Sequence, residues 1–98
     1  MTPQEMVRQE ARLIILRALA GEPDGRLNSS LLQSTLEAFG LTRSREWVHE
    51  ELAWLADVAA IAVQDIASVR VASLTDKGRE HVERRRVIEG IKRPSFGG

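Results

Sequence analysis

The stretch AIAVQDIASVRVASLTDKGR, residues 60–79, decides the fold of this chain. Two runs within it, 60–66 and 68–74, alternate apolar residues with small or polar ones, as half-buried strands do. Only a short link near Asp65 to Ser68 separates the two runs, which predicts a small β-hairpin. Three segments with helical spacing precede the hairpin and a fourth follows it, so we expect a mainly α-helical chain.

The first two helical segments carry start and stop signals. Thr2 and Glu5 form a capping box, which predicts a helix that runs to about Ala20. Asn28 is a good N-cap for the second helix, and Gly40 can adopt the left-handed conformation that ends it. The short connection after Gly40 has the length of a helix-turn-helix turn.

The third helical segment begins after Ser44, a favourable N-cap, and is expected to end near Asp57. Trp47 and Trp54 lie beside its apolar stripe and are expected to cover the core, because large aromatic side chains favour burial. The stripe itself predicts one buried face, with apolar residues at helical spacing: Val48, Leu52 and Leu55.

The last helix is expected to begin at Asp76, after the N-cap Thr75, and to end near Glu89, with Gly90 as its stop. It holds too few apolar residues to be buried in its own domain: Val82, Val87, Ile88 and Ile91. We therefore expect a homodimer in which this helix meets the first helix of a second copy. On the first helix, the residues that lie partly off its main stripe could supply the other half of that interface: Val7, Ala11 and Ile15.

Length and composition limit the possible classes of protein. The chain has 98 residues, 43% of them apolar, which suits a single domain over residues 1–91 with a flexible tail over 92–98. It contains no cysteine, no secretory-type N-terminus and no apolar run long enough to cross a bilayer, so we expect a cytoplasmic protein without membrane contact. The net charge is zero, although the segment from residue 77 onward carries seven basic and three acidic residues. A neutral chain is not the profile of a nonspecific nucleic-acid binder.

The order helix–helix–helix–hairpin–helix is the layout of a winged helix-turn-helix domain, with three helices, a two-stranded wing and a C-terminal helix. The hairpin followed by Leu74-Thr75-x-x-Gly78 resembles winged-helix regulators of the MarR, PadR and ArsR type. The segments 27–40 and 43–47 also resemble small ArsR-like proteins of Mu-like prophages. The resemblance implies a transcriptional regulator whose third helix enters the major groove and whose terminal helices form a dimer. The absence of cysteine departs from the metal-sensing ArsR members, so metal sensing is not implied.

Sequence-specific binding to double-stranded DNA is the first functional hypothesis. It requires hydrogen-bond donors in the first turn of the third helix and a cation on the wing, since base edges and phosphates are contacted from these places. Four acidic residues on the same helix oppose this function: Glu46, Glu50, Glu51 and Asp57. The candidate DNA-binding residues are Thr42, Arg43, Ser44, Arg45, His49 and, on the wing, Arg70.

The alternative is a winged-helix module that binds another protein and no DNA. The neutral net charge, the acidic third helix and the two tryptophans favour it, because aromatic residues often anchor protein interfaces. A basic rim around Arg43 and Arg45 would favour DNA, whereas an apolar patch that includes Trp54 would favour a protein partner.

An enzymatic function is not expected. His49 and His81 are the two histidines of the chain, and neither belongs to a nucleophile–base or metal-binding motif. We therefore predict no catalytic residues, no metal site and no cofactor, and the sequence points to no particular small-molecule effector.

Overall fold

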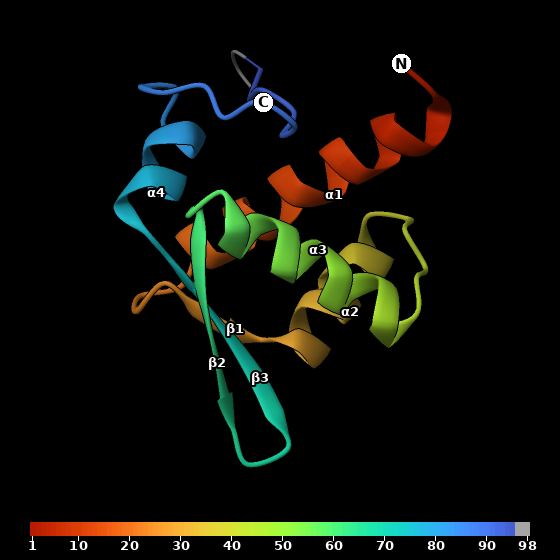
Figure 1. Cartoon of the computed structure of the whole chain (residues 1–98), viewed down its shortest axis with the longest axis vertical. Helices are drawn as coiled ribbons and strands as arrows, with labels where there is room; N and C mark the ends of the chain where they lie inside the picture. The colour runs from red at the N-terminus through yellow and green to blue at the C-terminus, as the bar shows by residue number, and fades with distance from the viewer. Residues whose placement is uncertain (96–98) are drawn as a thin grey trace.

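The computed structural model describes residues 1–95 (Figure 1). Over this range the chain is mostly helical, with four helices and a three-stranded antiparallel sheet. The elements are α1 (Pro3–Ala20), β1 (Arg26–Asn28), α2 (Ser29–Ala38), α3 (Arg45–Asp57), β2 (Ile61–Ile66), β3 (Val69–Leu74) and α4 (Asp76–Val82).

The four predicted N-caps are confirmed. In each helix the side chain of the cap accepts a hydrogen bond from the backbone N–H three residues later, which satisfies one of the free donors of the first turn. The pairs are Thr2 with Glu5 (3.1 Å), Asn28 with Leu31 (2.9 Å), Ser44 with Trp47 (3.1 Å) and Thr75 with Gly78 (3.1 Å). Helix starts could therefore be located from the sequence to within a residue.

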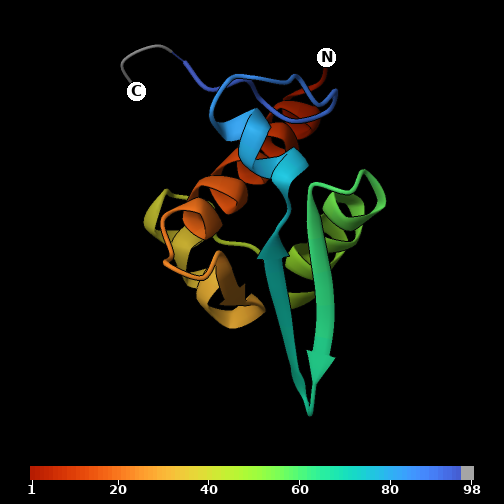
Figure 2. The same ribbon diagram turned by 90° about the vertical axis from the view of Figure 1, so that its left-hand side faces the viewer.

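The sheet has one strand more than the predicted two-stranded wing. The strand order is β1-β3-β2, so β3 pairs with β2 on one side and with the short β1 on the other. The predicted hairpin is confirmed as β2 and β3, whereas β1 was missed because it has only three residues, too few to show the alternation of a strand. Figure 2 shows the far end of the β2–β3 hairpin extending beyond the helices. At that end Ala67 takes a positive φ of 56°.

The core lies between α1 and the other helices, with the sheet closing one side. The predicted stripe of α3 is confirmed, since Val48, Leu52 and Leu55 are all buried. Helix α1 contributes residues from most of its circumference, including Ala11 and Ile15, which the sequence analysis assigned to a dimer interface. That assignment was wrong for these two residues, because both are fully buried within the domain.

The C-terminal helix is shorter than predicted. Helix α4 ends at Val82, and Arg84 adopts a positive φ of 62°, so the chain turns where we expected it to continue as a helix to Glu89. The turn returns Ile88 and Ile91 to the core, where they are 5% and 4% exposed. The premise that these isoleucines lack partners in their own domain was therefore wrong. Only Val87, at 51% exposed, remains on the surface as predicted.

His81 holds this returning segment in place. It is fully buried, its Nδ1 accepts a hydrogen bond from the Ile88 N–H (3.1 Å), and its Nε2 lies 2.9 Å from the Lys92 carbonyl oxygen. The Lys92 N–H in turn donates to the Gln9 carbonyl of α1 (3.2 Å). The predicted tail of residues 92–98 thus starts at a residue that is bonded to α1, and residues 96–98 lie outside the described residues. None of the helices in the described range is both long enough and apolar enough to span a bilayer.

Candidate functional site

The candidate site is the face formed by the first two turns of α3 and the β2–β3 hairpin. Arg45 is the first residue of α3 and is exposed, as is Thr42 in the preceding loop. No carboxylate among residues 1–95 forms an ion pair with Arg45. Its guanidinium therefore lies at the surface with its full charge.

Two of the predicted DNA-binding residues have local roles in the structure. The Ser44 hydroxyl caps α3, and the Arg43 guanidinium donates a hydrogen bond to the Thr42 carbonyl (3.0 Å). The same guanidinium lies over the Trp47 ring, 5.5 Å from its centre. The Arg43 side chain thus points toward Trp47. Arg43 is therefore not placed beside Arg45 as a second residue that contacts bases.

His49 connects α3 to α2, and its pKa is influenced by charges on the hairpin. Its Nε2 lies 3.2 Å from the hydroxyl oxygen of Ser29, a buried residue at the start of α2. Burial lowers the pKa of His49 below 6.5, and the positive charges of Arg70 and Arg45 lower that pKa further. Asp65 and Glu46 act in the opposite direction. These charges influence the imidazole because α3 and the hairpin bring Arg45, His49 and Arg70 together on one face.

Arg70 lies on β3 directly opposite Asp65 of β2. Its Nε donates to Asp65 Oδ1 at 3.0 Å, and its Nη2 is 3.5 Å from Oδ2. The hydrogen bonds from Arg70 lower the pKa of the Asp65 carboxyl, and the same contact raises the pKa of the guanidinium. Asp65 therefore partly neutralises the cation of the wing and orients it.

The acidic residues of α3 do not all face outward, although the sequence led us to expect four exposed carboxylates on this helix. Glu51 is 1% exposed, and its carboxylate accepts hydrogen bonds from Arg8 and Arg12 of α1, the latter at 2.6 Å. Glu50 also lies on the α1 side, 4.0 Å from Arg8 Nη2. Counting Glu51 as a charge that opposes DNA was therefore wrong, since two guanidinium groups neutralise it inside the protein. The i, i+4 spacing of Arg8 and Arg12 could have predicted a buried carboxylate partner, because it places both guanidinium groups on one side of a helix that also carries many apolar residues.

The two tryptophans cover the core, as predicted, and both are partly buried against it. The Arg12 guanidinium stacks on Trp54, 3.7 Å from the centre of the ring. Gly90 lies against the other part of this ring, because a Cβ added to Gly90 would be 2.5 Å from Trp54 Cζ2. Trp54 is thus partly covered by Arg12 and Gly90 and is not among the exposed large apolar residues.

Comparisons with known proteins place the chain in a phage protein family. It is 33% identical over 90 residues to the uncharacterized protein gp26 of Escherichia phage Mu, which covers 92% of this chain and 93% of that protein. It is 30% identical over 78 residues to an uncharacterized protein of Haemophilus influenzae (strain KW20 / Rd), covering 79% of this chain and 76% of that protein. The chain therefore belongs to the family of phage Mu gp26. No protein-family model and no solved structure matches it.

Proposed function

We propose that this protein is a winged-helix transcriptional regulator, encoded by a prophage, that binds a specific sequence of double-stranded DNA. The observation that carries the proposal is the shared face of Arg45, His49 and Arg70. One cation lies in the first turn of α3 and the other on the hairpin, which are the two positions from which winged-helix proteins contact a duplex. The phage relative is consistent with a prophage gene.

In this proposal α3 enters the major groove with its N-terminal turn toward the bases. Arg45 contacts a base edge, since its guanidinium can donate two parallel hydrogen bonds to guanine, and Thr42 donates from the preceding loop. Arg70 contacts a backbone phosphate, for which it exchanges part of its interaction with Asp65. Because Glu51 is neutralised inside the protein, fewer carboxylates face the phosphates than the sequence of α3 implies.

A second candidate function is protein binding beside the hairpin. Leu31 of α2 and Val69 of β3 are 51% and 43% exposed, and they line the same shallow hollow. Exposed apolar residues that lie together are typical of contact surfaces between proteins. Trp54, expected from the sequence as an anchor for a protein partner, is partly covered by Arg12 and Gly90 and gives this function little support.

The homodimer predicted from the sequence is retained as part of the proposal, with a reduced interface. Ile88 and Ile91 belong to the core. Near the two ends of the chain, the exposed apolar residues left for a partner are Met1, Met6 and Val87, which are 79%, 58% and 51% exposed, and the predicted Val7 is partly buried. Sedimentation of the intact chain at high micromolar concentration tests this part, and a monomer there would contradict it.

The DNA-binding proposal is tested with a pool of random duplexes at a series of salt concentrations. We expect binding that weakens with salt, because each phosphate contact releases counterions. Arg45→Ala should cost about 1–3 kcal/mol at one position of the selected site. Arg70→Ala should weaken binding to all sequences alike and reduce the salt slope by about one unit. Arg85→Ala is the matched control, because it removes an exposed cation, paired with Glu83, from the C-terminal segment, which lies at the opposite end of the molecule from the tip of the hairpin (Figure 1).

The outcomes separate the two functions. If the protein binds no duplex above background even at low salt, the DNA-binding proposal is wrong and protein binding becomes the favoured function. If Arg85→Ala reduces binding as much as Arg45→Ala does, binding depends on overall charge and α3 has no special role.

A further inference from the structure

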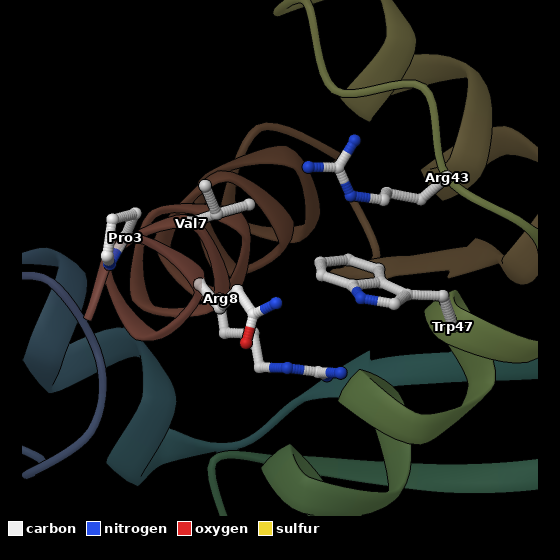
Figure 3. Close-up of a pocket in the computed structure, with 6 residues that line it drawn as sticks. Pro3, Val7, Arg8, Arg43 and Trp47 are labelled. Atoms are coloured by element: carbon white, nitrogen blue, oxygen red, sulfur yellow. The ribbon is translucent and has the colours of Figure 1, made fainter.

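A hollow lies between the start of α1 and the loop that leads into α3 (Figure 3). Its volume is about 380 Å³, which is within the range of small-molecule sites. Pro3, Gln4, Val7 and Arg8 line it from α1, and Arg43 and Trp47 line it from the other side. The hollow plays no part in the DNA-binding proposal, because it is built around the side of α3 that faces α1.

Two guanidinium groups approach the same aromatic ring at this hollow. Arg8 and Arg43 lie 5.0 and 5.5 Å from the centre of the Trp47 ring, and in Figure 3 they appear on opposite sides of it. These distances are longer than the 3.7 Å between Arg12 and Trp54, so neither guanidinium is closely stacked on Trp47. Arg43 therefore keeps donors that can turn toward a bound group, and Arg8 keeps those that are not directed at Glu51.

The charge of the hollow is close to one positive unit. Arg8 shares the Glu51 carboxylate with Arg12, and Glu50 lies 4.0 Å from Arg8, so these four residues together are neutral. Arg43 is different, because within residues 1–95 its guanidinium donates to the Thr42 carbonyl and no carboxylate forms an ion pair with it. The N-terminus of α1, where Pro3 and Gln4 lie, carries positive potential from the helix dipole, which the Glu5 carboxylate in the same turn offsets in part. An anion with a single charge matches this balance better than a doubly charged phosphate.

Apart from Gln4, the remaining lining is apolar. The Pro3 ring, the Val7 side chain and the Trp47 indole surround the space next to the two guanidinium groups. An aromatic wall favours a flat apolar body, and a guanidinium fork favours a carboxylate, which it can bind through two parallel hydrogen bonds.

We propose that this hollow binds a small aromatic carboxylate, whose carboxylate meets Arg43 and Arg8 and whose ring packs between Trp47 and Val7. Arg43 supplies most of the recognition, since its charge is uncompensated. Trp47 and Val7 provide the apolar contact that distinguishes an aromatic acid from an inorganic anion.

The test uses indole-3-acetate as the probe and its neutral amide, indole-3-acetamide, as the matched compound. In proton–nitrogen NMR spectra of the ¹⁵N-labelled protein, each tryptophan gives its own indole N–H resonance, and Trp47→Phe identifies that of Trp47. We expect indole-3-acetate to shift the Trp47 resonance and to leave that of Trp54 in place, because Trp54 does not line the hollow. The amide should bind far more weakly, since it lacks the charge.

Arg43→Gln is expected to weaken binding of indole-3-acetate by about tenfold or more, because a charge-assisted contact is lost. Arg45→Gln is the control, as it removes an exposed cation that does not line the hollow. An unchanged Trp54 resonance in the Arg43 variant verifies that the variant is folded. The proposal is overturned if the probe leaves the Trp47 resonance unmoved at millimolar concentration, if the amide binds equally well, or if inorganic phosphate competes with the same affinity. Because no DNA is present, these outcomes are independent of the proposed DNA binding.

Discussion

Arg12 of α1 and Glu51 of α3 are joined by a buried hydrogen bond of 2.6 Å between Nε and Oε1. Arg8 donates to the other oxygen of the same carboxylate, and Arg12 also donates to the Gly90 carbonyl (2.8 Å). One carboxylate thus links α1, α3 and, through Arg12, the C-terminal segment. This network sets how α3 sits on α1, and therefore how the first turn of α3 is presented at the surface.

Glu51→Gln tests the weight of this network. Removing the charge leaves the Arg12 guanidinium at a buried site without a counterion, so we expect the free energy of unfolding to fall by about 3 kcal/mol or more. Urea denaturation measures it. Glu50→Gln is the control, because Glu50 is 65% exposed and its ion pair with Arg8 is long, at 4.0 Å. It should change stability by less than about 1 kcal/mol, and equal effects of the two substitutions would contradict the central role of Glu51.

Leu52→Ala tests the packing of α3. Leu52 is completely buried between Val48 and Leu55 on the apolar stripe, so the substitution should destabilise the protein by about 2–5 kcal/mol. Leu31→Ala removes the same atoms from a side chain that is 51% exposed and should have a much smaller effect. Thermal or denaturant unfolding compares them. A loss well under 1 kcal/mol for Leu52→Ala would mean that this face of α3 is not buried.

Gly78→Ala tests the junction between the hairpin and α4. A Cβ at Gly78 would lie 2.2 Å from the Ala60 carbonyl oxygen and 2.8 Å from Leu74 Cδ1, so the backbone itself must move. We expect a loss of about 1–3 kcal/mol, which is typical of overpacking. Gly21→Ala is the control, since its nearest atoms would be 3.5 and 3.6 Å away. It should leave the melting temperature unchanged or slightly raised; an equal loss in both variants would contradict the steric explanation.

Titration of His49 tests the geometry of the candidate DNA-binding face. We expect its pKa in the folded protein to be below 6.5, because burial and then the charges of Arg70 and Arg45 disfavour the imidazolium. Arg70→Ala should raise this pKa, since it removes a repelling cation and frees the Asp65 carboxylate to stabilise the charged ring. NMR titration of the imidazole measures both values, with Arg85→Ala as the control. An unchanged pKa in the Arg70 variant would show that the hairpin does not lie next to α3.

The same shift predicts how His49 contributes to stability. Its folded pKa is depressed, so the unfolded chain takes up a proton first as the pH falls. The contribution of His49 is therefore complete above about pH 6.5 and is lost as the pH decreases from there to the folded pKa. His49→Gln should remove this part of the pH dependence in denaturation experiments, and an unaltered profile would contradict the assignment.

Several features could be predicted from sequence because their causes are local. The caps Thr2, Asn28, Ser44 and Thr75 bond to an N–H only three residues away, so the start of each helix is determined within a short segment. The stripe of α3 and the two longer strands are likewise visible as periodic patterns, because burial of one face imposes the period of the element.

Other features were decided by contacts between residues far apart in the chain. Strand β1 exists because Arg26–Asn28 finds a free edge of β3, and its three residues carry no pattern of their own. Glu51 is an inward-facing carboxylate only because Arg8 and Arg12, about forty positions earlier, lie opposite it. Ile88 and Ile91 look unpartnered in the sequence, yet Arg84 reverses the chain and His81 and Lys92 hold them in the core. Local hydrogen bonds and periodicity thus determined the elements of this protein, whereas the pairing of buried charges and of strand edges, which depends on tertiary packing, decided which surfaces remain for a partner.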